Sequence, residues 1–146
     1  MGAVLDTLPA PLRAPVEHWH ERFGDTTKAD ALARIVACSE FASAVALREK
    51  DWLLENVASF EHAPDPQQLE VFVADVASAD ADVARVKSRL RRFRNRYMLH
   101  VLWREIFALA DLDETLHSLS LLADRLLDAA SQYSSDRLAS RYGNVR

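Results

Sequence analysis

The chain has 146 residues, of which 49% are hydrophobic and 27% charged, and its formal net charge is −4 at pH 7. This length and composition are typical of one soluble globular domain, and the single cysteine, Cys38, excludes an internal disulfide or a cysteine-based metal cluster. Residues 1–12 lack the pattern of a secretory signal and no apolar run is long enough to span a bilayer, so we expect a cytoplasmic protein.

Helical spacing of apolar residues runs through almost the whole sequence, and strand-like alternation of useful length is missing. We therefore predict an all-α fold of about six helices in one domain, 1–146. After an N-terminal lead-in marked by Pro9, Pro11 and Pro15, the expected short helices cover residues 12–24, 27–37, 40–48, 52–58 and 66–77. The expected helix starts are Thr26 or Thr27, Ser39, Asp51 and Asp65.

Two long helices are predicted for the rest of the chain, over residues 81–110 and 112–142, with Asp80 capping the first. The tight turn at Asp111 predicts that they form an antiparallel hairpin. Asp111 and Glu114 have the spacing of a capping box. The expected packing seam of the last helix has coiled-coil-like steps and consists of Leu112, Leu116, Leu119, Ala123, Leu126, Ala130 and Tyr133.

A strongly basic segment lies inside the first long helix. Seven basic residues and no acidic one occur between Arg85 and Arg96, so the rest of the chain carries a formal charge of −11. At helical spacing, one face holds Arg85, Arg89, Arg92 and Arg96, and Lys87, Arg91 and Arg94 lie mostly on another. The segment is a solvated face, a set of ion pairs inside the fold, or a docking surface formed by Arg85, Arg89, Arg91, Arg92, Arg94 and Arg96.

No pattern in the sequence predicts a catalytic, cofactor-binding or metal-binding residue. The histidines lack metal-ligand spacing; they are His18, His20, His62, His100 and His117. The acidic pairs Glu17 with Glu21 and Asp80 with Asp82 fit helix surfaces or helix starts, where acids favour the helix dipole. Cys38 has no nearby base and is expected to be a small buried hydrophobe.

Several short sequence motifs occur in a specific order along almost the whole chain. They are Ala37-Cys38-Ser39-Glu40-Phe41-Ala42, Asp51-Trp52-Leu53, the stretch 90–99 followed by Trp103-Arg104-Glu105, and the stretches 109–116 and 119–124. In this order they resemble the N-terminal part of the glutamine synthetase adenylyltransferase/adenylyl-removing enzyme family. The stretch 90–99 is the most specific match.

This resemblance implies an enzyme of nitrogen regulation that adds AMP from ATP to glutamine synthetase and removes it by phosphorolysis, under control of the PII signalling protein and glutamine. Family members hold Mg²⁺ through a glycine-serine turn followed by an Asp-x-Asp pair. Here the sequence 134–136 is Ser-Ser-Asp, but position 138 is Leu, so the second carboxylate is missing. Asp80-Ala81-Asp82 and Asp111-Leu112-Asp113 are expected to be helix starts. The chain is therefore expected to be an inactive helical segment that docks on a missing nucleotidyltransferase domain.

Two alternatives stay open from the sequence. The chain is a stand-alone helical adaptor for other proteins, or it is a small nucleic-acid-binding domain that uses the helix around 85–96. The charge of −11 outside that helix argues against nucleic acid, because phosphate contacts need a cationic face. An isolated segment is also expected to expose apolar surface and to self-associate.

Overall fold

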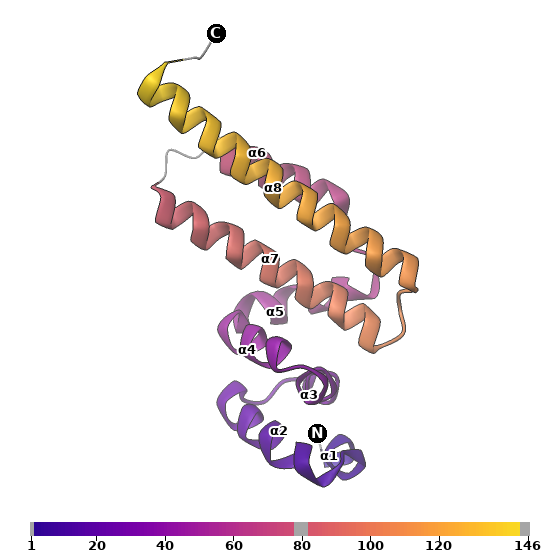
Figure 1. Ribbon diagram of the computed structural model, residues 1–146. Coiled ribbons are helices and arrows are strands. Elements are labelled where there is room, and N and C mark those ends of the chain that lie inside the picture. The colour runs from indigo at the N-terminus through magenta and orange to yellow at the C-terminus, as the bar shows by residue number, and fades with distance from the viewer. Residues whose placement is uncertain (1, 78–81, 144–146) are drawn as a thin grey trace.

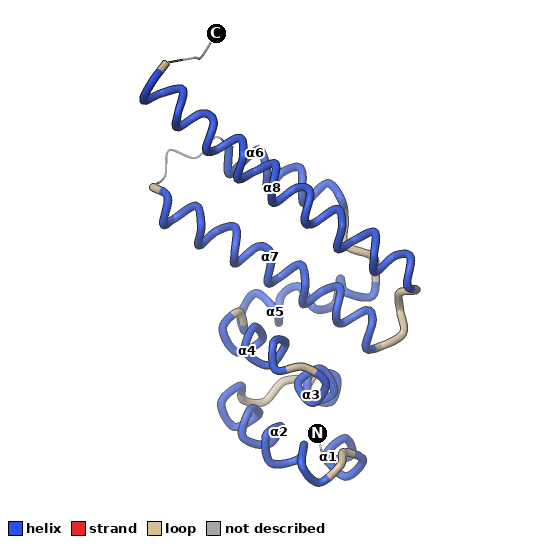
Figure 2. Tube along the Cα trace, in the orientation of Figure 1, coloured by secondary structure: helices blue, strands red, loops and turns tan. Residues whose placement is uncertain are grey.

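The computed structural model describes residues 2–77 and 82–143, and these form eight α-helices and one 3₁₀ helix, with no strand among them (Figure 1). The helices are α1 Gly2–Thr7, α2 Ala10–Phe23, α3 Ala29–Cys38, α4 Glu40–Arg48, α5 Lys50–Asn56, the 3₁₀ helix η1 Val57–Glu61, α6 Pro66–Ala77, α7 Val83–Ile106 and α8 Leu112–Tyr142. Figure 2 shows short loops between several of them. The predicted all-α class with a long antiparallel final pair is confirmed, but the described helices outnumber the six expected.

The long helix α7 separates two groups of helices (Figure 1). On one side, α1 to α5 and η1 share a core with its C-terminal half, where Phe23, Leu53 and Phe60 pack in one cluster with Leu99 and Trp103. On the other side, α6 and α8 lie side by side and pack on α7. The C-terminal half of α7 is therefore surrounded by other helices, as its apolar residues predict.

The second group of helices has a small, continuous core of its own. Leu69 of α6 packs with Tyr97 and Val101 of α7 and with Leu122 of α8. Further along, the core continues with Val73, Val76, Val86 and Ala129. The small side chain of Ala129 on α8 lets α6 approach closely.

The N-terminal region differs from the prediction in its helix starts. The short helix α1 was not expected, and α2 begins at Ala10, so Pro11 and Pro15 lie within a helix rather than in a lead-in. Pro11 lies in the first turn, where its missing N–H has no intrahelical acceptor, whereas Pro15 lies in the interior of α2 and removes one intrahelical hydrogen bond. Helix α3 begins at Ala29, later than predicted, and the Thr26 hydroxyl accepts instead from the Lys28 amide at 3.3 Å.

Two of the predicted helix caps are confirmed and one start is shifted. The Ser39 hydroxyl accepts from the Ala42 amide at 3.2 Å, and the Asp65 carboxylate accepts from the Gln67 amide at 2.9 Å. Helix α5 begins at Lys50, two residues before the predicted helix 52–58. The 3₁₀ helix η1 follows α5 directly, where the sequence predicted that the helix ends at residue 58.

Helix α7 is shorter than the predicted helix 81–110. Asp80 lies outside the described residues, and the N-cap is Asp82, whose carboxylate accepts from the Arg85 amide at 2.8 Å. At the other end, Ala108 has a φ of 52°, and the Leu109 amide donates to the Arg104 carbonyl at 2.8 Å. This is a Schellman ending, which stops the helix at Ile106 although the sequence offers alanine instead of the usual glycine.

Candidate docking surfaces

Ion pairing inside the fold accounts for one half of the predicted docking residues. Glu49, at the end of α4, is 5% exposed and accepts from the Arg92 Nε through both carboxylate oxygens, at 3.0 and 2.9 Å. Arg96 donates to the same carboxylate from Nε at 2.7 Å, and its guanidinium lies over the Trp52 ring, 4.7 Å from the centroid. These contacts fix α7 against α4 and α5.

The electrostatics of Glu49 follow from these two partners. Burial alone would raise the pKa of its carboxyl group. Hydrogen bonds from Arg92 and Arg96, together with their positive charges, outweigh that effect and hold the pKa of Glu49 below its ordinary value. Glu49 is therefore a charged, buried anchor for two arginines of the basic segment.

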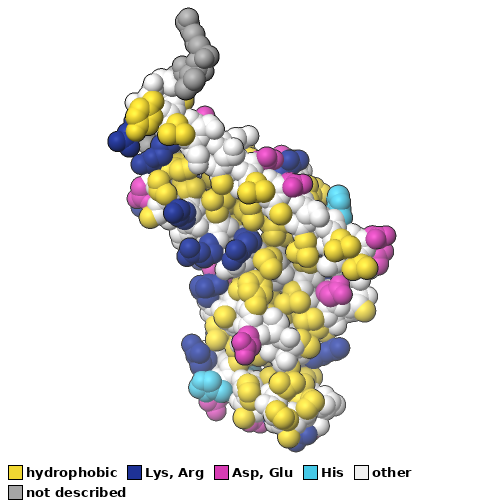
Figure 3. Space-filling view, viewed as in Figure 1, with side chains coloured by type: hydrophobic (Ala, Val, Ile, Leu, Met, Phe, Trp, Pro, Cys, Tyr) yellow, Lys and Arg dark blue, Asp and Glu magenta, His cyan; other side chains and the backbone are white. Residues whose placement is uncertain are grey.

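The remaining arginines of the predicted docking face are placed differently. Arg89 pairs with Asp75 of α6, so three of the six predicted residues have acidic partners within the fold. Arg85 and Arg91 are exposed, and Arg94 donates to the amide oxygen of Asn95 at 3.3 Å. In Figure 3, lysine and arginine side chains (dark blue) gather over the N-terminal half of α7. The structure thus combines two of the three sequence interpretations, internal pairing and an exposed basic surface.

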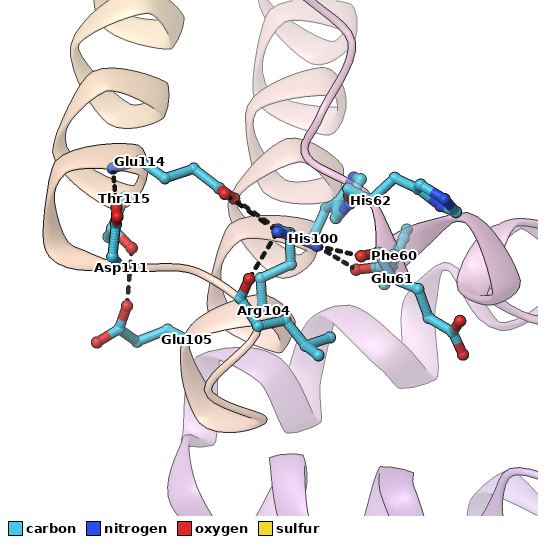
Figure 4. Close-up of polar contacts among 10 residues, drawn as sticks. Phe60, Glu61, His62, His100, Arg104, Glu105, Asp111, Glu114 and Thr115 are labelled. Carbon is cyan, nitrogen blue, oxygen red and sulfur yellow. Dashed lines mark hydrogen bonds and ion pairs between the residues drawn. The ribbon is translucent and has the colours of Figure 1, made fainter.

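Arg104, which no sequence pattern marked as a site residue, lies at the junction of three segments (Figure 4). Its Nε donates to Glu114 Oε1 at 2.6 Å, and its Nη2 donates to Glu114 Oε2 at 3.1 Å and to the Leu109 carbonyl at 2.8 Å. The carbonyls of Phe60 and Glu61, at the end of η1, accept from Arg104 at 3.3 and 2.5 Å. Arg104 thereby joins η1, the α7–α8 turn and the start of α8.

The position of Arg104 has a clear physical reason. The last carbonyls of a helix have no intrahelical donor, and a cation at that end both donates to them and opposes the negative end of the dipole. The Glu114 carboxylate pairs with the positive charge of Arg104 and does not close the predicted capping box. The other half of that box is confirmed, because the Asp111 carboxylate accepts from the Glu114 amide at 2.8 Å. The signal that was present in the sequence is a lone arginine within an apolar stretch.

His100, one turn before Arg104 on α7, contacts the next carbonyl of the same segment. Its Nε2 lies 2.9 Å from the His62 carbonyl, and its ring stacks on Phe60 with centroids 4.2 Å apart. Burial lowers the pKa of the imidazole below its usual 6.5, and the charge of Arg104 acts in the same direction, whereas the His62 carbonyl and Glu114 oppose it. The carbonyls of Phe60, Glu61 and His62 are thus all bound by two side chains of α7.

Lowering the pH from about 7.5 to about 5 is expected to destabilise the fold through His100. In the unfolded chain His100 binds a proton near pH 6.5, whereas in the folded chain it does so only at lower pH. The contribution of neutral His100 to the free energy of unfolding is therefore complete above pH 6.5 and declines below it. The variant His100→Gln, which keeps a donor for the His62 carbonyl, should show a smaller decline of Tm across this range. Thermal unfolding measures it, with exposed His62→Gln as the control; an undiminished decline in His100→Gln would assign the effect elsewhere.

The packing of α8 corrects the predicted seam. Its buried residues are Ser118, Leu122 and Ala129, which lie about a quarter of a turn from the predicted line. Of the predicted seam, Leu126, Ala130 and Tyr133 are partly buried, but the N-terminal half is exposed. The difference arises because α8 packs on α6 and α7 together, which moves the buried face toward the space between them.

An exposed row of leucines results from this rotation. We call it the leucine stripe; it consists of Leu109 (43% exposed), Leu112 (68%), Leu116 (54%), Leu119 (38%) and Leu127 (70%). From 112 to 127 the spacing places these side chains and Ala123 on one face of α8. Hydrophobic side chains (yellow) also extend along the visible face of α7 and α8 in Figure 3. Monomeric soluble proteins rarely leave such a contiguous apolar row uncovered.

Metal binding, the exposure of Cys38 and membrane-spanning helices were the remaining questions for the described residues. Within residues 2–77 and 82–143 no group of three His, Cys, Asp or Glu could hold a metal ion, so the Mg²⁺ implied by the resemblance does not fit here and no transfer step is assigned to these residues. Cys38 is exposed, contrary to the prediction that it is buried, because it lies in the last turn of α3 on the side away from the core. The same ranges contain no helix that is both long and apolar enough to cross a membrane.

The fold thus defines the class as an all-α helical domain with internal ion-pair anchors and one uncovered apolar face. A family model described as glutamate-ammonia ligase adenylyltransferase matches residues 29–145. The chain therefore belongs to the glutamate-ammonia ligase adenylyltransferase family, which confirms the resemblance found in the sequence.

Three curated relatives carry the same printed name, bifunctional glutamine synthetase adenylyltransferase/adenylyl-removing enzyme. The chain is 33% identical to the protein of Pseudomonas aeruginosa over 98% of this chain and 14% of that protein. It is 32% identical to that of Thioalkalivibrio sulfidiphilus over 90% of this chain and 13% of the relative, and 36% identical to that of Pseudomonas putida over 75% and 12%. The chain thus spans 14% or less of these relatives. No solved structure matches it.

Proposed function

We propose that this chain is a non-catalytic, helical docking segment of an enzyme that adenylylates and deadenylylates glutamine synthetase. Family membership supports the enzyme, and the small share of the relatives that the chain spans supports a segment of it. The order of the matching motifs along the chain favours a position of this segment at the N-terminal end of the adenylyl-removing half. In this proposal the whole enzyme uses ATP and Mg²⁺ and responds to PII, and this segment supplies no catalytic group.

The observation that carries the docking role is the leucine stripe, formed by α8 and by Leu109 in the turn before it. Its five leucines are 38 to 70% exposed, whereas the apolar residues on the adjacent face of α8 are packed against α6 and α7. The occupant that we propose is the nucleotidyltransferase domain of the same enzyme, since the relatives contain a much longer polypeptide beyond the matching segment. The arginine face is a less suitable docking surface, because Arg89, Arg92 and Arg96 already have acidic partners.

The proposal is tested by complementation. This chain is mixed with the separately expressed remainder of the enzyme, and phosphate-dependent release of AMP from adenylylated glutamine synthetase is followed. We expect that the chain restores activity, and that Leu116→Asp with Leu127→Asp weakens its association with the remainder by at least about tenfold, because two apolar contacts are replaced by desolvated charges.

Val71→Asp is the matched control, because Val71 is a comparably exposed (63%) apolar residue on α6, outside the leucine stripe. It should leave complementation unchanged. Sedimentation of the chain alone shows whether a second copy covers the stripe instead. Self-association that the double substitution abolishes, combined with no binding to the remainder, would replace this proposal with the adaptor or homodimer alternative.

A further inference from the structure

A polar groove of about 290 Å³ lies between the end of α4 and the N-terminal half of α7. Its lining residues are Arg48, Glu49, Ser88, Arg91, Arg92 and Asn95. None of them belongs to the leucine stripe, so the groove is independent of the docking surface proposed above. The lining therefore contains three arginines and a single carboxylate.

Arg92 is held in a fixed orientation in this groove. Buried Glu49 accepts only from its Nε, through both oxygens, so the two terminal nitrogens have no partner among residues 2–77 and 82–143. The Arg92 side chain is 60% exposed although its Nε is anchored. A guanidinium that is already oriented loses less conformational freedom when it binds an anion.

Two further positive charges in the groove lack a counter-charge. Arg48 and Arg91 are exposed and form no ion pair with any described residue, and the charge of Glu49 is already shared by Arg92 and Arg96. Because the chain as a whole is acidic, this local excess of positive charge is not a general property of its surface.

Asn95 adds an uncharged donor to the arginines of the groove. It is 6% exposed, and its amide oxygen accepts from Arg94 at 3.3 Å. Its amide nitrogen has no acceptor in the described part of the chain, although the residue lines the groove. This nitrogen is not one of the buried atoms that lack a partner, so it is open to the groove and can donate to an anion there.

We propose that this groove binds one doubly charged oxyanion, a phosphate group that is either free or part of a small phosphate ester. A dianion matches the two uncompensated charges of Arg48 and Arg91. Its oxygens can accept from these residues, from the terminal nitrogens of Arg92 and from the amide of Asn95. A single carboxylate would leave one guanidinium without a counter-charge.

The full ¹⁵N-labelled chain is titrated with sodium phosphate at constant ionic strength, and amide shifts are followed in residues 48–49 and 88–95. We expect saturable shifts with phosphate and with sulfate. Arg48→Gln with Arg91→Gln should weaken binding by at least about tenfold, because charge-assisted contacts are lost. Methyl phosphate that binds as tightly as phosphate identifies an ester ligand, and much weaker binding identifies the free ion.

The control is Arg22→Gln with Lys28→Gln, which removes the same charge from exposed positions outside the groove and should leave binding unchanged. Asn95→Leu tests the amide separately and should weaken binding at unchanged helix content. Linear shifts of equal size in the wild type and in the Arg48 and Arg91 variant would show general salt effects and overturn the site. A glutamate-rich peptide that saturates the same amides at lower concentration than phosphate would assign the groove to carboxylates instead.

Discussion

Arg104→Met is expected to lower the free energy of unfolding by about 3 kcal/mol, the lower end of the range for removing one partner of a buried ion pair, because the Glu114 side chain is 29% exposed. The substitution leaves the Glu114 carboxylate without its cation and leaves the carbonyls of Phe60, Glu61 and Leu109 without their side-chain donor. The Arg104 side chain is only 7% exposed, so water replaces few of these contacts. For a domain of ordinary stability this is a large share of the total. Urea unfolding followed by circular dichroism measures the change.

Two further variants separate charge from hydrogen bonding at Arg104. Arg104→Lys keeps the charge but lacks the planar fork, so we expect it to recover only part of the loss. Adding Glu114→Leu to Arg104→Met removes the unpaired carboxylate, but the three carbonyls still lack donors. Arg137→Met, at an exposed residue whose side chain donates to the Tyr133 hydroxyl, should change stability by less than about 0.5 kcal/mol. Equal effects of Arg104→Met and Arg137→Met would show that the junction is not important for stability.

Glu49→Gln is expected to cost about 2 kcal/mol, because hydrogen bonds to charged groups are the stronger ones and two arginines lose their shared counter-charge. The amide has nearly the same shape as the carboxylate, so the effect reports charge rather than packing. The folded-state pKa of Glu49 lies below the ordinary 4.5, so this contribution is complete above pH 4.5 and is lost as the pH falls through the lower folded-state pKa. The stability difference between wild type and Glu49→Gln should therefore shrink in acid.

The two partners of Glu49 should contribute unequally. Arg96→Gln is expected to cost more than Arg92→Gln, because Arg96 is 27% exposed and also stacks on Trp52, whereas Arg92 is 60% exposed. A double-mutant cycle between Glu49 and each arginine measures the two coupling energies. A vanishing coupling with Arg96 would contradict its role as an anchor. Simultaneous charge reversal of Arg89, Arg92 and Arg96 would break three internal ion pairs, so it would test folding rather than docking.

The order and approximate extent of the helices followed from local sequence. Ser39 and Asp65 cap their helices as their side-chain chemistry predicts, and the 112–142 pattern matches α8. The end of α7 could not be found in this way, because its Schellman ending uses Ala108 with positive φ, where local propensity favours glycine. The extra helix α1 adds Val4 and Leu5 to the N-terminal core, a contact that local spacing does not reveal.

The sequence by itself determined the all-α class, the hairpin of two long helices, the basic segment and the family to which the chain belongs. Only the tertiary structure decided which basic residues are free, because Glu49 and Asp75 come from other helices and their approach depends on long-range packing. It also decided which face of α8 is covered. The helical pattern shows that α8 is amphipathic, but the direction of its buried face depends on the joint position of α6 and α7, and this leaves the leucine stripe exposed.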